Sequence, residues 1–488
     1  MNFAGLLFLL ITHFLSGRGI LRLFKLQLDP IPAVCLSFIL GVPAVSFVPC
    51  ILQLMKIPLA ANSVYIGISV FTAVCCIPLL VSFTKPRLPK FIMPKLYEWP
   101  ALLVLLFFVV VSVWRCYYMP PYSRDMLSGP ELIAEYAVRE KTMINSVFNI
   151  DLHTSNNYFK SPYVTTLQII YKLLVFPFGQ LWLSVMFVSF TTFIYSLLMD
   201  RVHPLIAGFL MLIFFAVPEL FAYTFVILYD YSNMVLFFTG FYFLTRYMQN
   251  EKFNDFIFSS LLFGLATYIR TESLILIAFM SPLFLVHRYR QKMPLAKIAL
   301  RLAIFMGVSI VFYVICIKIF VHNFVPLPLD VSHEINKHIT DFSPLFKRLS
   351  DIVTVLIFSD TGPIFYGCFI IFFVYLAIAD LVWPRKYNKE ALYALYGVAV
   401  IYFGFGFIGY LLPLADLQNT TKRGFFKIIP IMLLYMANSG LIQRLSNAIK
   451  WWEDPESAPK KKVVAAPTPK RKLAPAPPPQ VANRPKKR

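Results

Sequence analysis

Apolar segments long enough to cross a lipid bilayer recur along almost the whole chain, and they limit what it can fold into. Such segments fall near residues 4–17, 30–50, 63–83, 99–118, 181–199, 204–219, 228–247, 255–270, 272–287, 298–320, 362–383, 391–412 and 425–444. A helix needs roughly 20 apolar residues to cross the hydrocarbon core. The segments are continuously apolar, whereas the strands of a membrane barrel alternate. We therefore predict an all-α polytopic membrane protein with about 13 transmembrane helices.

The composition excludes a soluble enzyme. Of the 488 residues, 58% are hydrophobic and only 14% are charged, whereas soluble domains carry about 25% charged residues. No Gly-rich phosphate loop, HExxH or GxSxG motif is present, so nucleotide-driven transport and Rossmann-type nucleotide-sugar chemistry have no support. The seven cysteines lie in or beside apolar runs without metal-ligand spacing and are read as packing residues.

The net charge of +21 is explained by topology and does not indicate nucleic-acid binding. Seven basic stretches lie between or after the apolar segments, at 16–25, 84–95, 199–203, 246–252, 287–297, 383–389 and in the tail from 450. Counting segments puts all seven on one side, which the positive-inside rule makes the cytoplasm. The long polar loops 119–162 and 321–361 then lie on the outer side.

These loops divide the chain. Residues 1–97 are predicted to hold three additional N-terminal transmembrane helices, and 98–449 a transmembrane catalytic region. Within loop 321–361, Phe342, Leu345 and Phe346 have near-helical spacing and predict short interfacial helices. The tail 450–488 is basic and Pro-rich, with nine prolines from Pro455 onward. It is expected to be a disordered cytoplasmic segment that contacts anionic lipid head groups or a partner, or has no partner at all.

Loop 119–162 holds the first candidate site residues. Asp125 follows the fourth apolar segment closely, where a carboxylate can accept a proton from an acceptor hydroxyl; the alternative is a solvated loop acid. Lys160 lies near the end of the loop, where its ammonium can meet a lipid phosphate or remain an ordinary interfacial lysine.

A helix is predicted from Pro130 with Glu131 in its first turn. Its apolar residues share one face, which is expected to lie on the bilayer, with Glu131 on the opposite, wet face. Glu140 falls among the apolar positions. Either the helix ends before Glu140, or Glu140 faces a partner.

Several ordered motifs across roughly 98–449 resemble those of the polyprenyl-phosphate-sugar glycosyltransferases of the GT-C fold, which include protein O-mannosyltransferases and the lipid A aminoarabinose transferase. They are the Asp125 loop, the Lys160-Ser161-Pro162 element, Tyr229-Asp230, Gly264–Glu272 and Lys422–Pro430. The family has an Asp-Glu pair where this chain has Asp125-Met126, and Lys-Pro-Pro-Leu where it has Lys160-Ser161-Pro162-Tyr163.

The resemblance implies a GT-C-like enzyme that transfers a sugar from a polyprenyl-phosphate carrier to a glycan, lipid or protein acceptor by inverting displacement. Asp125 would be the general base. Lys160, Arg270 and Arg423 would hold the donor phosphate and stabilise the leaving group. Asp230, like Glu131, is a secondary catalytic candidate, and Glu272 and Glu140 are supporting ones; an Arg270–Glu272 structural pair is the alternative at that position.

The expected location is the cytoplasmic membrane with the site facing outward, or the endoplasmic reticulum membrane in a eukaryote. No cofactor is assigned beyond the lipid-linked donor. His322, His333 and His338 match no metal template, so a divalent metal has no support. The competing functions are a transporter or flippase of a lipid-linked saccharide, which would carry its charges near the bilayer middle, and an O-antigen polymerase or ligase.

Overall fold

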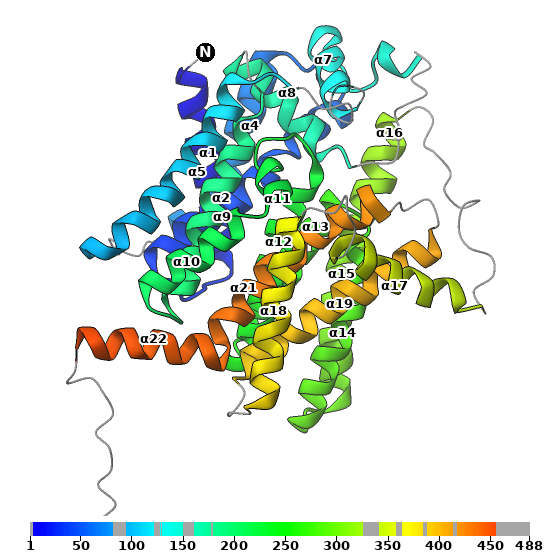
Figure 1. Ribbon diagram of the computed structural model, residues 1–488. Coiled ribbons are helices and arrows are strands. Elements are labelled where there is room, and N and C mark those ends of the chain that lie inside the picture. The colour runs from blue at the N-terminus through cyan, green and yellow to red at the C-terminus, as the bar shows by residue number, and fades with distance from the viewer. Residues whose placement is uncertain are drawn as a thin grey trace, which may run out of the picture.

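The computed structural model describes residues 3–81, 94–121, 127, 129–149, 161–176, 179–325, 341–357, 364–383, 388–412 and 417–454. Across these ranges every regular element is a helix and there is no strand, which confirms the all-α class (Figure 1). The predicted loop residues Asp125 and Lys160, and the tail from 455, lie outside the described ranges.

The first half of the chain contains α1 (Phe3–Leu23), α2 (Pro30–Val45), α3 (Val48–Leu54), α4 (Ala61–Val81), η1 (Leu96–Glu98), α5 (Trp99–Tyr118), α7 (Pro130–Glu140), η2 (Ser146–Asn149), α8 (Tyr163–Val175), α9 (Leu181–Met199), α10 (Pro204–Phe215), α11 (Pro218–Ala222) and α12 (Tyr229–Asn250).

The second half contains α13 (Phe253–Ile269), α14 (Ser273–Arg290), α15 (Leu295–Val314), η3 (Ile315–Val321), α16 (His322–Phe324), α17 (Ser343–Ile357), α18 (Ile364–Val382), α19 (Lys389–Leu411), η5 (Leu417–Thr421), α20 (Lys422–Gly424), η6 (Phe425–Lys427), α21 (Ile428–Asn438) and α22 (Gly440–Glu453).

Seven helices are long and apolar enough to cross a membrane, or eight when a bent pair counts as one span. They are Phe3–Leu23, Pro30–Leu54, Ala61–Val81, Leu96–Tyr118, Leu181–Met199, Leu295–Phe324 and Lys389–Leu411, and the bent pair is Lys422–Asn438 with Gly440–Glu453. This is the composition of a helical membrane protein. The expected number of about 13 is not confirmed, since these seven or eight are all that the described part supplies.

Helix α12 explains part of the difference. The apolar run 228–247 does form a helix, but it carries polar residues along its length, among them Asn233 and Thr239. Almost every side chain of α12 is buried by neighbouring helices. A helix surrounded by protein does not need the uniformly apolar surface that lipid requires, so α12 is a central helix of the bundle.

Helices α1 and α2 cross at glycines. A Cβ atom built on Gly17 would lie 1.7 Å from the carbonyl oxygen of Ser37, and one built on Gly41 would lie 1.8 Å from that of His13. Gly19 approaches α4 in the same way, since its Cβ would lie 1.8 Å from the carbonyl oxygen of Cys75. Small residues at helix crossings let backbones approach closely in membranes, so these glycines set the packing of the three N-terminal spans.

The N-terminal spans also pack on the rest of the bundle. His13 Nε2 of α1 lies 3.1 Å from the hydroxyl of Tyr171 in α8. Phe47, between α2 and α3, stacks on Tyr268 of α13 with ring centroids 4.4 Å apart. The four helices before η1 therefore share one core with the helices of the 98–449 region.

The described parts of the basic stretches lie at one end of the molecule, which we call the basic end. Contacts between distant loops show this directly: Gln27 accepts hydrogen bonds from Arg246 and Lys252, Arg201 pairs with Glu390, and Lys95 and His203 both pair with Glu453. This grouping agrees with the prediction that the basic loops share one side. The elements α7 and α16 lie at the other end, which we call the opposite end (Figure 1).

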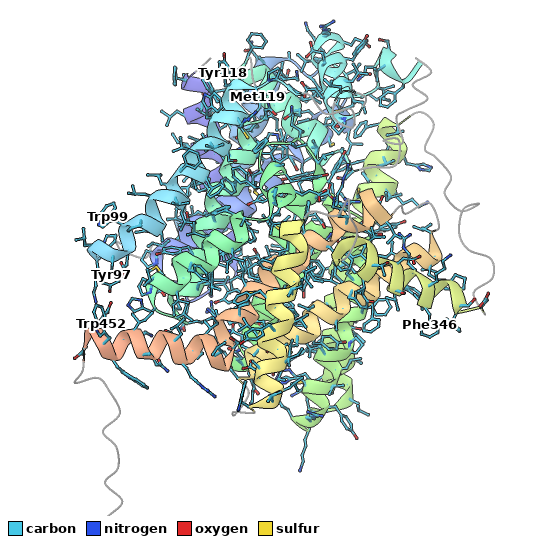
Figure 2. The ribbon with its side chains drawn as sticks, in the orientation of Figure 1. Tyr97, Trp99, Tyr118, Met119, Phe346 and Trp452 are labelled. Atoms are coloured by element: carbon cyan, nitrogen blue, oxygen red, sulfur yellow. The ribbon has the colours of Figure 1, made fainter. Side chains whose placement is uncertain are left out.

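Helix α5 reaches from one end to the other. Figure 2 shows Trp99 and Tyr118 at its two ends, and between them Leu105 is the one large apolar side chain that is buried. The 20 residues of α5 span about 30 Å, the thickness of a bilayer core. Aromatic residues at both ends are typical of a span whose termini lie at the two membrane surfaces.

A helix predicted in the second polar loop is observed as α17. Phe342 and Phe346 at its start are 52% and 68% exposed, and Figure 2 shows Phe346 at the edge of the molecule. The other side of α17 packs on α19, where Tyr402 donates a hydrogen bond of 2.7 Å to the carbonyl oxygen of Leu349. Residues 326–340 of this loop, with His333 and His338, lie outside the described ranges.

Candidate functional site

Four charged side chains meet at the opposite end, where α12, α13, α14 and η6 start or end. Arg270 donates to Asp230 through one guanidinium nitrogen and to Oε2 of Glu272 through the other, at 3.1 Å. Lys427 lies 3.4 Å from the second oxygen of Glu272. We call these four residues the charged network. It brings together three residues predicted from the sequence, namely Asp230, Arg270 and Glu272.

The charged network is buried and formally neutral. Asp230 is 3% exposed and Lys427 is 1% exposed, while the side chains of Arg270 and Glu272 are 19% and 14% exposed. Burying a single charge is expensive, so buried charges persist when each has a partner of opposite sign. The alternative predicted at this position, an Arg270–Glu272 pair, is present as one contact of the larger network.

Helix ends favour the sign of each charge. Asp230 is the second residue of α12 and Glu272 is the residue before α14, so both carboxylates lie at helix N-termini. Arg270 caps the C-terminus of α13. Negative charge is stabilised at the positive end of a helix and positive charge at the negative end, so the three helices and the network stabilise one another.

The break between α13 and α14 is held from the side by Asn233 of α12. Its amide donates to the carbonyl oxygen of Ala266 at 2.7 Å and to the hydroxyl of Ser273 at 2.9 Å. Arg270 is in an extended conformation at this break, which turns its side chain back toward Asp230. An amide in the second turn of α12 therefore fixes the corner that carries Arg270 and Glu272.

Arg423 lies beside the network. Its guanidinium is 5.7 Å from the ring centroid of Tyr223, and this ring packs edge-on against Phe426 at 4.9 Å. The neighbouring Lys422 pairs with Glu219 of α11 at 2.7 Å. Arg423 is thus on the same short segment as Lys427, because η6 follows α20 directly.

A small, partly open apolar pocket lies beside Tyr229, next to the charged network. It is lined by residues of α7, the start of α8, Tyr229 and the segment η3–α16. The hydroxyl of Tyr229, the residue before Asp230, donates a hydrogen bond of 3.0 Å to the carbonyl oxygen of Ser161. This bond joins the residue that precedes Asp230 to the residue that follows Lys160 in the chain.

Glu131 corrects the prediction for α7. It is 9% exposed and faces α8, where Lys172 pairs with it at 2.6 Å and Gln168 donates to it at 2.5 Å. Trp182 in turn donates to Gln168 at 2.7 Å. The predicted wet face is therefore wrong for Glu131, because α8 covers that side of α7, and a partner helix is not visible in the pattern of α7 alone.

Glu140 is the last residue of α7, and Lys141 after it takes a left-handed conformation with φ of 59°. Its carboxylate accepts from the backbone N–H of Ser146 at 3.0 Å. Of the two alternatives for Glu140, the structure does not show a helix that ends before it, because α7 includes Glu140; the carboxylate has its partner in the adjacent turn. Neither Glu131 nor Glu140 contacts the charged network.

The α7–α8 contact shifts two pKa values outside the apolar spans. A hydrogen bond from Lys172 is the main cause that lowers the pKa of Glu135, and the charges of Lys172 and Arg139 act in the same direction. Burial acts to lower the pKa of Lys172, but the charges of Glu131 and Glu135 outweigh it and the pKa is raised. The contact therefore keeps both groups ionised.

Lys427 is the member of the network that the sequence analysis missed. A signal for it exists: Arg423 and Lys427 are four residues apart and lie on one side of a helical segment. A lysine inside an apolar run is costly unless it is paired. The remaining predicted residues, Asp125 and Lys160, lie outside the described part of the chain, and no metal-binding cluster of three or more His, Cys, Asp or Glu occurs within that part.

The fold thus defines an all-α protein with several helices suited to a membrane and a buried charged network at one end. The chain matches no protein-family model, no curated protein and no solved structure.

Proposed function

We propose that the protein is a membrane glycosyltransferase that moves a sugar from a polyprenyl-phosphate carrier to an acceptor on the outer face of the membrane. The observation that carries the proposal is the charged network around Arg270, buried at the end opposite the basic loops. If the basic end faces the cytoplasm, as the positive-inside rule predicts, the network lies toward the outer side.

Arg270 is suited to hold a phosphate without leaving its place. A guanidinium has five N–H donors in a fixed plane, and the two carboxylates engage its two terminal nitrogens. Asp230 and Glu272 therefore fix the direction of the fork, and we propose that the remaining N–H groups bind a donor phosphate. Such preorganised donors stabilise the charge that develops on the leaving phosphate.

Lys160 and Arg423 are proposed as the other phosphate ligands. The Tyr229–Ser161 hydrogen bond supports this for Lys160, because it ties the adjacent residues of the two segments together. For Arg423 the support is its position on the same short segment as Lys427. Three cations around one phosphate would neutralise the leaving group as the glycosidic bond breaks.

Asp125 is proposed as the general base that takes the proton of the acceptor hydroxyl. Asp230, the second carboxylate considered, is already bonded to Arg270, so we assign it the positioning of that guanidinium. One direct displacement would invert the anomeric carbon. The apolar pocket beside Tyr229 supports a lipid-linked donor, because the first isoprene units next to the phosphate need an apolar surface.

The test uses the full chain in nanodiscs and polyprenyl monophosphate, the leaving group, as a probe that does not depend on the unidentified sugar. Arg270→Lys keeps the charge but removes the planar fork, and it should weaken polyprenyl-phosphate binding by tenfold or more. The matched control is Arg201→Lys at the basic end, because Arg201 is also paired with a buried carboxylate, Glu390. The control should bind as the wild type does.

Transfer is then measured with labelled polyprenyl-phosphate sugars. Asp125→Asn should lower the transfer rate by about 10²–10⁴-fold, the usual contribution of a general base, while leaving binding of the monophosphate unchanged. Equal binding by Arg270→Lys and Arg201→Lys would remove the phosphate site. Movement of the intact lipid-linked saccharide across the bilayer, without transfer of the sugar, would favour a flippase instead.

A further inference from the structure

The C-terminal helix α22 leaves the bundle sideways. It is bent by 56° from α20–α21 at Ser439, and in Figure 1 it extends away from the body at the basic end. One side of α22 is fixed to the protein: the hydroxyl of Ser446 accepts a hydrogen bond of 2.8 Å from the backbone N–H of His203. Glu453, at its far end, accepts from Lys95 at 2.5 Å.

A second side of α22 is apolar and exposed. Leu441, Leu445 and Trp452 are 41%, 52% and 78% exposed, and the spacings of four and seven residues place them in one strip along the helix. We call these three residues the apolar strip. No described helix covers it, so in water it would be a row of unprotected hydrophobic side chains.

A third side of α22 is polar and basic. Arg444, Asn447 and Lys450 are all exposed and follow one another at intervals of three residues. This spacing puts Arg444 at the flank of the apolar strip and Asn447 and Lys450 on the side away from it. Residues 455–488, which continue the chain, contain ten Lys or Arg and a single acid, Glu456. A helix with one apolar and one basic side is typical of helices that lie in the plane of a membrane surface.

The position of α22 matches a membrane surface defined independently by α5. Figure 2 shows Trp452 along the same edge of the molecule as Tyr97 of η1 and Trp99, the aromatic residues at the lower end of the span Leu96–Tyr118. Along α5, Leu103 and Phe107 are 55% and 63% exposed, as expected for side chains that face lipid. The apolar strip therefore continues the lipid-facing surface of α5 at the level where the aromatic residues mark the interface.

We propose that α22 lies in the bilayer surface at the basic end, with the apolar strip in the acyl region and Arg444 and Lys450 on anionic phospholipid head groups. Anionic lipids attract basic segments next to the membrane. The proposal does not depend on the glycosyltransferase activity, because it rests on α22 and α5 alone.

Site-directed spin labelling of the full chain in nanodiscs tests the proposal. A nitroxide is placed at Leu445→Cys in the apolar strip, and at Asn447→Cys as the matched water-side control. The background protein carries Ala at Cys75 and Cys76, the two half-exposed cysteines among those described. The same background without an added cysteine measures the signal from labels on the remaining native cysteines. Collisions with oxygen report lipid, and collisions with a water-soluble nickel chelate report water.

In discs that contain phosphatidylglycerol, the label at 445 should collide several-fold more with oxygen than with nickel, and the label at 447 should show the reverse. In discs of phosphatidylcholine alone, the label at 445 should move toward water. The charge-neutral variant Arg444→Gln with Lys450→Gln should narrow the difference between the two lipid compositions.

Three results would overturn the proposal. Equal nickel access at 445 and 447 would show that the apolar strip does not enter the bilayer. Identical depth at 445 in both lipid compositions would remove the role of anionic head groups. A label at 445 that collides with neither reagent would show that a protein surface, such as a second copy of this chain, covers α22.

Discussion

The crossing of α1 and α2 predicts that one methyl group at Gly41 destabilises the protein. Its Cβ would lie 1.8 Å from the carbonyl oxygen of His13, whereas such carbon–oxygen contacts need about 3.3 Å. Because the obstacle is a backbone atom, no side chain can rotate away, and the two helices would have to separate by roughly 1.5 Å. Overpacking of this kind costs about 1–3 kcal/mol, and the backbone contact puts Gly41→Ala at the upper end.

Gly307→Ala is the matched control. Gly307 also lies within a helix, α15, but a Cβ built there meets no atom within 4 Å. Alanine favours the helix over glycine by about 1 kcal/mol at either position. At Gly307 this gain in helix stability is the whole effect, because the added methyl group meets no atom. At Gly41 the gain offsets only part of the cost of the clash. The two variants should therefore differ by about 3 kcal/mol, with the wild type between them.

The assay is the apparent melting temperature in detergent, measured as the folded fraction that survives heating and elutes as a monodisperse peak. Gly41→Ala should melt a few degrees below the wild type, and Gly307→Ala at or above it. If Gly41→Ala melted with Gly307→Ala, the close approach of α1 and α2 would not be real, and the packing of the three N-terminal spans would need another explanation.

Three further predictions concern charged contacts. The pKa of Glu135 is lowered from 4.5, and that of Lys172 is raised from 10.5 although burial acts to lower it. Their contact should therefore stabilise α7 fully between pH 4.5 and pH 10.5. This stability is lost as the pH falls through the lowered value or rises through the raised one; hydrogen-exchange protection of α7 that stays flat to pH 3 would contradict it. Arg270→Met, which leaves two buried carboxylates facing one lysine, should cost about 3–5 kcal/mol by thermal unfolding, and adding Asp230→Leu should recover part of the loss; a single variant as stable as the wild type would refute the pairing. Glu453→Ala, which removes the partner of two basic side chains, should expose α22 to protease at concentrations that leave the wild type intact; an unchanged cleavage pattern would argue against that anchor.

The apolar runs predicted where most helices lie, because a continuous apolar stretch of 20 residues has few other solutions. Their internal breaks were less predictable. The run 30–50 divides into α2 and α3 around Ser46 and Phe47, and the run 425–444 ends at Ser439, beyond which α22 turns aside. Both breaks depend on how neighbouring helices take up the freed backbone groups, and this information is not local to the run.

The candidate site was partly predictable for a similar reason. The alternating direction of successive helices is enough to put Asp230, Arg270 and Glu272 at the same end of the bundle. Each of the three lies at the helix terminus that is farther from the basic end. Their direct pairing, and the addition of Lys427, depend on how η6 packs against the start of α12. Glu131 was misassigned because the polar side of one helix looks solvated until the helix that covers it is known.

The contacts of α22 have a consequence for how the chain is assembled during synthesis. Glu453 pairs with His203, 250 residues earlier, and with Lys95, 358 residues earlier. At about 5–20 residues per second, the ribosome adds α22 roughly 12–50 s after the loop between α9 and α10 has emerged. During that interval the backbone N–H of His203 and the basic side chains nearby have no Ser446 or Glu453 to bind. Closure of the basic end is therefore a late event in biogenesis, and premature chain termination ahead of Ser439 would leave that surface open to the insertion and quality-control machinery.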